Sequence, residues 1–180
     1  MLAPRPNPEL GAMNMTARLL WLALTGAATS AAHGQDASSS RFIGVWRLVE
    51  TDQRLADGTR RPSPAYGARP QGYLIYSDAK RMCAMLMDPD RPRWKSDSAP
   101  TEVELRGSFE RFFSYCGTYE VNTAEGFVIH RVELDKSPNA VGVIRKRFFK
   151  FSGNRLELTV ASPLPAGVVE YRLVWERVTE

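Results

Sequence analysis

From Arg41 onward the chain alternates apolar and polar residues with a period of two, and short turns interrupt the alternation. A period of two is typical of β-strands, whose successive side chains point to opposite faces. The turns "TAEG", "KSPN" and "SGN" join consecutive segments. Connections this tight join antiparallel strands, because parallel strands need long crossovers. The pattern therefore predicts an all-β, antiparallel up-and-down barrel of about eight strands that closes on itself and holds one small ligand.

One segment breaks the alternation. In "TEVELRGSFERFFSY", Val103, Phe109, Phe112 and Phe113 fall roughly on one face of a helix, and Thr101 is a candidate N-cap. The first strand is "FIGVWRLVE", and "QGYLIYSDAKRMCAMLMD" supplies the next two, so this helix is expected between the third and fourth strands. The loop "DGTRRPSPAYGARP" contains Gly and Pro breakers and is predicted to lack regular structure. An open meander covered by the helix is the alternative to a barrel, but it leaves unprotected sheet edges.

The N-terminal segment has the features of a secretory signal peptide. Arg18 precedes the apolar run Leu19 to Leu24, and small residues follow as far as Ala32 and Gly34. We expect cleavage near Ala32 or Gly34 and a periplasmic or secreted protein. A single membrane anchor is the alternative, but the apolar run is much shorter than the roughly 20 residues that a spanning helix needs.

These features predict three regions. Residues 1–34 form the signal peptide region, residues 35–40 a linker, and residues 41–180 the barrel domain. The segment before the signal peptide fits neither a signal sequence nor the fold, so Met13 and Met15 are candidate starts.

Charge and composition exclude several classes of function. The 24 Lys and Arg exceed the 20 Asp and Glu by four, and the basic residues are scattered among carboxylates, which does not indicate nucleic-acid binding. Two His and two Cys are too few for a convincing zinc site, and no G-x-S-x-G, P-loop or dinucleotide motif is present. We therefore expect no metal and no cofactor. In an exported protein, Cys83 and Cys116 form either one disulfide or two buried thiols, and spacing alone does not decide.

Several segments resemble a known family. Gly44-Val45-Trp46 in the first strand, with the basic residue of "LVWER" in the last, is similar to the lipocalin pattern. The segments "GYLIYSDAKRMCAMLMDPDRP", "YCGTYEV", "VIHRVELDKSPNAVG" and "LVWER" resemble the bacterial and fungal lipocalin-like domain proteins, over nearly all of Phe42 to Arg177. The resemblance implies a calycin-type barrel in which Gly44 and Trp46 are structural and Arg177 packs over Trp46 at the closed end. It implies a fold more than an activity.

Alternation also predicts which side chains face the interior. The inward set comprises Trp46, Leu48 and Glu50 in the first strand, Arg145, Arg147, Phe149 and Phe151, then Leu156, Leu158 and Val160, and finally Tyr171, Leu173, Trp175 and Arg177. An interior arginine needs a partner, because burying an isolated charge is costly. Arg147 therefore pairs with an acid such as Glu50 or Glu133, is turned outward by a bulge, or binds an anionic ligand.

Three functions fit this interior. The first is a non-catalytic, exported binding protein, a monomer or weak dimer, for a mostly apolar and anionic or amphipathic ligand. The second is an isomerase or cyclase in which His130 or Glu50 moves a proton and Arg147 or Tyr119 stabilises negative charge. The third is a structural or stress protein with a filled barrel. No nucleic acid and no stable membrane span are expected in any of them. The candidate ligand-binding residues are Tyr76, Tyr119, His130, Arg147, Leu158 and Leu173.

Overall fold

The structure is a computed structural model that describes residues 39–160 and 164–179. The predicted signal peptide, and the predicted linker as far as residue 38, lie outside the described residues. The elements in chain order are β1 (Gly44–Leu55), β2 (Arg60–Pro62), β3 (Gln71–Tyr76), β4 (Arg81–Met87), α2 (Glu102–Glu110), β5 (Phe112–Asn122), β6 (Phe127–Asp135), the 3-10 helix η1 (Pro138–Ala140), β7 (Ile144–Ser152), β8 (Arg155–Val160) and β9 (Val168–Arg177).

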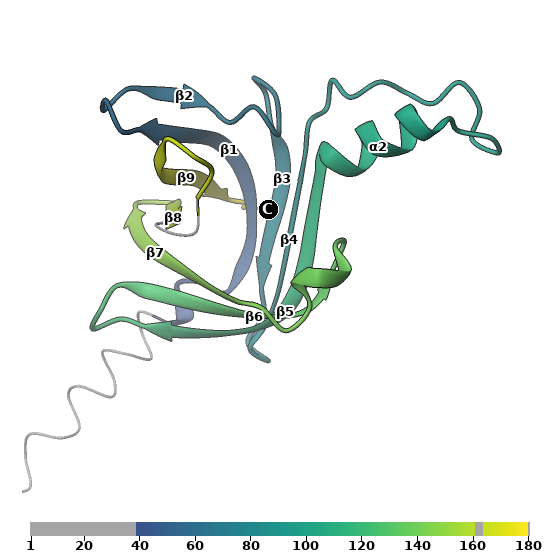
Figure 1. The fold of residues 1–180 in the computed structure, drawn as a ribbon. Coiled ribbons are helices and arrows are strands. Elements are labelled where there is room, and N and C mark those ends of the chain that lie inside the picture. Colours follow the sequence, from purple (N-terminus) through teal and green to yellow (C-terminus); the bar gives the residue numbers. More distant parts are fainter. Residues whose placement is uncertain (1–38, 161–163, 180) are drawn as a thin grey trace, which may run out of the picture.

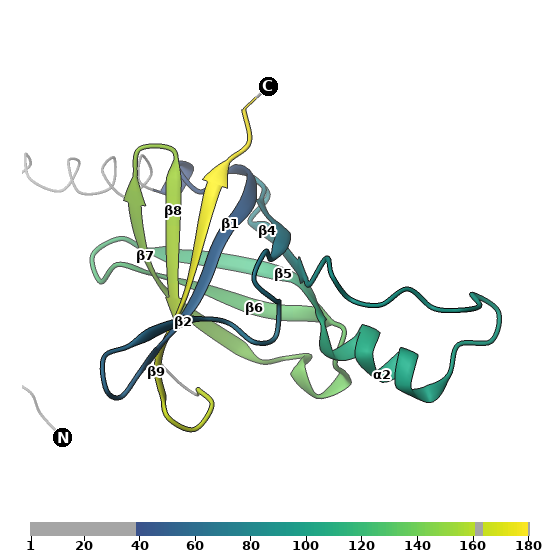
Figure 2. The same cartoon turned by 90° about the horizontal axis from the view of Figure 1, so that it is seen from above.

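The strands form a closed antiparallel barrel (Figures 1 and 2). In the described part of the chain, the hydrogen-bonded order runs β1, β3, β4, β5, β6, β7, β8, β9, and β9 returns to β1. The long β1 makes this closure possible, because it pairs with β3 near its start and with β9 along most of its length. The predicted eight-stranded antiparallel barrel is therefore confirmed.

The predicted position of the helix is wrong. Helix α2 follows β4 and precedes β5, because the additional short strand β2 comes before it. Strand β2 forms inside the loop that was predicted to be irregular and pairs only with β1, from Asp52 to Arg54. Pro62 is tolerated there because an edge strand does not need every backbone N–H for pairing.

The extent and packing of α2 also differ from the prediction. Thr101 caps the helix and forms a capping box with Glu104, but the helix ends at Glu110, so Phe112 and Phe113 belong to β5. No residue of α2 is buried, and the helix stands outside the barrel wall (Figures 1 and 2). The apolar face that the sequence predicted for the helix therefore consists of two residues of α2, Val103 and Phe109, and two residues of β5, Phe112 and Phe113.

The closed end of the barrel is filled by aromatic rings. Phe42 is fully buried and meets the rings of Tyr76, Phe149 and Phe151 edge-on, with centroids 5.0 to 5.3 Å apart. Trp46 lies beside Phe151, and its indole Nε1 donates to the carbonyl of Phe42 at 2.8 Å. These rings belong to the packed core of the barrel, so this end is filled by side chains.

Cys83 and Cys116 form a disulfide between β4 and β5. The two residues lie directly opposite each other in the strand register, next to a β-bulge between Cys116 and Gly117. Their neighbours Met82 and Ala84 are buried in the core, so by alternation the bridge lies on the outer face of the barrel. This decides between the two alternatives that spacing left open.

Candidate functional site

A β-bulge in β1 determines which carboxylates can reach the interior. Trp46 and Leu48 are buried in the core, but the register with β9 shifts between Leu48 and Glu50. A one-residue shift moves every following side chain to the other face. The prediction that Glu50 lines the interior is therefore wrong: its side chain is 52% exposed and pairs with Arg172 on the outside.

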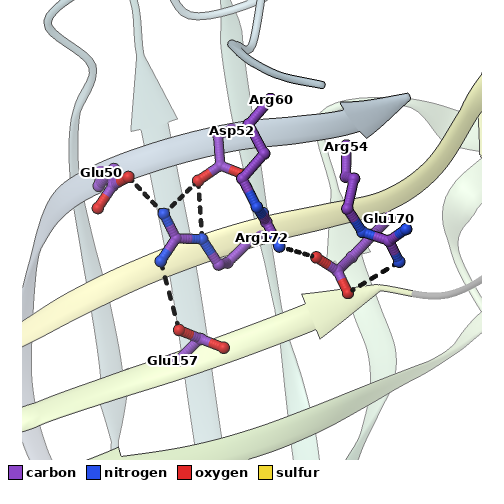
Figure 3. A network of polar contacts seen from close by, with 7 residues as sticks. All are labelled: Glu50, Asp52, Arg54, Arg60, Glu157, Glu170 and Arg172. Carbon is purple, nitrogen blue, oxygen red and sulfur yellow. Dashed lines mark hydrogen bonds and ion pairs between the residues drawn. The ribbon is translucent and has the colours of Figure 1, made fainter. Parts of the chain in front are cut away.

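Glu50 belongs to an ionic network on the outer face (Figure 3). Arg172 of β9 contacts Glu50 and Asp52 of β1 and also Glu157 of β8, at 3.4 Å from the last. A second arginine, Arg60 of β2, joins Asp52 to Glu170 with contacts of 2.5 and 2.6 Å. Figure 3 shows the arginines lying between carboxylates from neighbouring strands. These acids therefore form ion pairs on the outer face, where β1 and β9 close the barrel, and their carboxylates do not take part in a reaction inside it.

The interior contains a cavity of about 90 Å³, measured as the space open to the centre of a water molecule. It is large enough for several waters or the head group of a small ligand. Its polar lining consists of His130, Arg147 and the side chains of three tyrosines. The complete lining is Tyr66, Leu74, Ala84, Leu86, Phe113, Tyr115, His130, Arg147, Leu158, Val160, Tyr171, Leu173 and Trp175.

His130 lies between two tyrosine hydroxyls. Its Nε2 is 2.7 Å from the hydroxyl oxygen of Tyr76, and its Nδ1 is 2.7 Å from that of Tyr115. The imidazole is 1% exposed. Burial, reinforced by the charges of Arg147 and Arg145, lowers the pKa of His130 to about 3. The ring is therefore neutral at ordinary pH, and both of its nitrogens are engaged.

Arg147 of β7 points inward, is half-buried and lines the cavity. Its guanidinium donates to the carbonyl of Lys146 at 3.0 Å, and within residues 39–160 and 164–179 it makes no ion pair. The neighbouring Arg145, in contrast, pairs with the buried carboxylate of Asp135 at 2.8 Å.

Arg147 has neither of the two expected acid partners and is not turned outward by a bulge. The two acids expected as its partners bind other arginines on the outside, Glu50 with Arg172 and Glu133 with Arg81. No register shift interrupts the pairing of β7 with β6 or β8, so no bulge turns Arg147 outward. Arg147 is a cavity cation without a carboxylate partner among the described residues.

The other predicted site residues divide into two groups. Leu158 and Leu173 line the cavity. Tyr119 does not, because its hydroxyl donates to the carbonyl of Ser77 at 2.9 Å. Tyr76 lies behind the cavity wall, where it holds His130. Of the predicted site residues Arg147, His130 and Tyr119, the first two therefore share the cavity and Tyr119 does not, although Tyr119 lies opposite His130 in the strand register.

Several aromatic residues that line the cavity were not among the predicted site residues. Tyr115 was placed at the boundary between the predicted helix and the strand that follows it, and was not assigned to the site, although the alternation Phe113, Tyr115, Gly117 of β5 contains the signal that places it inside. Tyr66 comes from the loop between β2 and β3, for which no periodicity exists. Two further lining residues, Tyr171 and Trp175, were predicted to face inward but were not assigned to the site. The Trp175 Nε1 is buried and lacks a hydrogen-bond partner among the described residues, whereas the Tyr171 hydroxyl lies close to the hydroxyls of Ser63 and Thr51.

The barrel, its aromatic floor and its cavity can be compared with known proteins. The sequence model of the lipocalin-like domain family matches residues 43–178. The chain belongs to this lipocalin-like domain family. A lipocalin-like barrel is in general a fold that binds small ligands, which agrees with an interior cavity of mixed character.

Solved structures with a similar chain trace include a lipocalin-like protein from Bacteroides uniformis, at 11% identity and a TM-score of 0.39, covering 77% of this chain and 99% of that one. An uncharacterized protein from Bacteroides eggerthii also matches at 11% identity and a TM-score of 0.39, covering 76% of this chain and 99% of its own. No curated protein matches the chain.

Two features are absent from the described residues, a cluster of metal ligands and a membrane-spanning helix. No group of three or more His, Cys, Asp or Glu side chains in residues 39–160 and 164–179 is arranged to hold a metal ion. In the same part of this lipocalin-like chain, no helix has the length and apolar character needed to cross a bilayer.

Proposed function

We propose that this lipocalin-like protein is an exported, non-catalytic binding protein that holds one small, mostly apolar molecule by an anionic or carbonyl head group. The observation that carries the proposal is Arg147, a cavity cation without a carboxylate partner among the described residues. A half-buried, unpaired guanidinium is unfavourable in the empty protein, and a ligand anion compensates for it.

The rest of the lining supports an apolar body on this ligand. Leu158 and Leu173 form part of the wall near Arg147, together with other aliphatic and aromatic side chains. Binding sites of this type combine an apolar wall with a few polar groups that fix the ligand orientation. The presence of free space also favours this function over a structural barrel with a filled interior.

The isomerase or cyclase alternative receives less support. Glu50 lies on the outer face, so His130 is the remaining proton-transfer candidate. A general base works best when its pKa is near the working pH, and the pKa of His130 is about 3. Its two nitrogens are also occupied by Tyr76 and Tyr115, so a substrate would have to displace one of them.

Arg147→Met tests the binding function. We expect the variant to keep or raise the melting temperature, because an unpaired charge is removed, and to bind organic acids about tenfold more weakly, because a charge-assisted hydrogen bond contributes about 1.5–3 kcal/mol. Thermal unfolding and calorimetric titration with fatty acids, polyketide-like acids and aromatic acids measure the two effects.

The matched control is Arg145→Met, on the same strand and face. Arg145 pairs with the buried Asp135, so its loss should lower the melting temperature. The proposal fails if Arg147→Met unfolds as readily as Arg145→Met and acid binding is unchanged. It also fails if native mass spectrometry of protein purified from its own host, together with the titrations, detects no bound molecule.

Export is tested by the mass of the mature protein. The run from Leu19 to Leu24 and the small residues that follow favour cleavage near Ala32 or Gly34. We expect a soluble mature protein that begins near His33 or Gln35. An intact Leu19–Leu24 segment recovered from membranes would contradict this part of the proposal.

A further inference from the structure

The polarity of the hydrogen bonds around His130 can be deduced by counting donors and acceptors. A neutral imidazole has one N–H and one lone-pair nitrogen, so it donates at one nitrogen and accepts at the other. Because His130 contacts Tyr76 through Nε2 and Tyr115 through Nδ1, one tyrosine donates to the ring and the other accepts from it.

Burial decides between the two arrangements. Tyr76 is 1% exposed, and in the described part of the chain its hydroxyl bonds only to His130. If that hydroxyl accepted from Nε2, its own proton would be buried without an acceptor, which is costly. Tyr115 lines the cavity and can direct its proton there. Tyr76 therefore donates to Nε2, the Nδ1–H donates to Tyr115, and the hydroxyl proton of Tyr115 points toward the cavity.

Arg147 is close to this hydroxyl. Both residues line the same cavity. Burial raises the pKa of Tyr115, and the charges of Arg147 and Arg145, together with a hydrogen bond from Arg147 to the Tyr115 oxygen, oppose the rise. A guanidinium has no acceptor, and the Nδ1–H of His130 already donates to the Tyr115 oxygen. A hydroxyl and a guanidinium thus offer two donors to the cavity, with no carboxylate partner for Arg147 among the described residues.

We propose that the cavity selects a carboxylate, one of whose oxygens accepts from the Tyr115 hydroxyl and the other from Arg147, and that His130 is the positioning residue that makes Tyr115 a donor. This inference rests on the proposed binding function and adds the chemical class of the head group. The two oxygens and single charge of a carboxylate match one hydroxyl and one guanidinium. A phosphate would leave an additional charge unpaired in a largely apolar cavity.

The binding test compares ligands that differ only in the head group. The full mature protein is titrated with butanoic, hexanoic, octanoic and phenylacetic acids, and with the matching methyl esters and primary alcohols. Wild type should bind the best acid at least about tenfold more tightly than its ester or alcohol. Tyr115→Phe and Arg147→Met should each remove most of this preference while changing alcohol binding little.

Tyr119→Phe is the matched control, because the Tyr119 hydroxyl bonds to Ser77 and does not line the cavity. It should keep the full preference for acids. Equal binding of acid and ester by wild type would overturn the carboxylate inference and leave the binding function standing. No binding of any probe, with no ligand in native mass spectrometry, would overturn both.

The tautomer of His130 provides a measurement that does not depend on a ligand. The chain has two histidines, His33 and His130, so ¹⁵N-histidine labelling gives few signals, and His33→Gln assigns them. We expect His130 to be neutral and protonated on Nδ1. The Nε2-protonated tautomer would mean that Tyr115 donates to His130, and would overturn the positioning role.

Discussion

The guanidinium of Arg177 lies over the indole of Trp46, with its central carbon 4.2 Å from the ring centroid. Its Nη1 also donates to the carbonyl of Ile43 at 2.7 Å, and the Trp46 indole donates to Phe42. The end of the last strand is thereby joined to the start of the first strand at the closed end of the barrel. This contact connects the two ends of the fold.

Trp46→Ala should destabilise the protein more than Arg177→Ala. Removing a large buried ring costs about 3–5 kcal/mol, whereas a cation–π contact contributes about 0.5–2 kcal/mol and a hydrogen bond about 1 kcal/mol. Urea unfolding of both variants measures the difference in the free energy of unfolding. Small and nearly equal effects would contradict the burial of Trp46.

Gly44→Ala should lower stability by about 1–3 kcal/mol. Gly44 has a φ of +134°, and an added Cβ would lie 2.6 Å from Nη1 of Arg177. Gly126→Ala is the control, since Gly126 has a positive φ of +70° but no neighbouring atom within 4 Å of an added Cβ. An equal loss in the two variants, measured by thermal unfolding, would show that contact with Arg177 is unimportant.

Removing the disulfide should lower the free energy of unfolding by about 2–4 kcal/mol, because the unfolded chain loses a cross-link. The bridge closes a sequence separation of 33 residues between Cys83 and Cys116. The measurement is chemical unfolding with and without reductant, for wild type and the Cys83→Ala/Cys116→Ala double variant. Reductant should destabilise only the wild type; an unchanged wild type would show that the bridge adds no stability.

His130 should make the protein less stable as the pH falls. Its pKa in the folded state is lowered to about 3, from an ordinary value of 6.5. Below pH 6.5 the unfolded chain binds a proton that the folded protein does not, so stability falls toward acid by up to about 1.4 kcal/mol per pH unit. His130→Gln should flatten this slope between pH 7 and about 5, where most carboxylates do not titrate. Equal slopes in urea unfolding would contradict a buried, neutral His130.

Asp52 should contribute stability that is lost at low pH. Burial alone raises the pKa of Asp52, but hydrogen bonds and charges from Arg172 and Arg60 outweigh this effect and lower it below 3.8. Its contribution is therefore present above the unfolded pKa and disappears as the pH falls through the folded pKa. Asp52→Asn should cost about 1–3 kcal/mol at pH 7 and progressively less below pH 4.

The control for this experiment is Asp90→Asn. Asp90 pairs with Arg69 at 3.1 Å, but both side chains are more than half exposed, and exposed pairs contribute little. Urea unfolding across pH should show little change for Asp90→Asn. A cost for Asp52→Asn that stays constant as the pH falls would contradict the lowered pKa of Asp52.

Much of the barrel could be predicted because strand alternation is a local property. The side of the sheet on which Arg147, Leu158 and Leu173 lie follows from their neighbours in sequence, because no register shift interrupts the pairing of β8 with β7 or β9. The bulge in β9 lies between Val168 and Glu170, outside the segment from which the face of Leu173 was predicted. The same rule failed for Glu50, because a single bulge in β1 reverses the faces beyond it. Sequence alone contains no clear signal for that bulge.

Prediction of the site was limited by contacts between distant segments. Tyr119 lies opposite His130 in the register of β5 and β6, yet His130 bonds to Tyr115 of β5 and Tyr76 of β3. Side chains in a barrel meet according to strand tilt and curvature as well as register. Adjacency in a flat register therefore does not identify the tyrosines that bond to His130.

The sequence by itself determined the antiparallel order of the strands and the inward face of Arg147 and His130, because turn lengths and alternation act over only a few residues. Tertiary structure decided that the acids expected to neutralise Arg147 bind other arginines outside the barrel. It also decided that Cys83 meets Cys116 and that Tyr115 shares the cavity with Arg147. These outcomes depend on strand closure and on a bulge, which bring together residues far apart in the chain and cannot be read from any one segment.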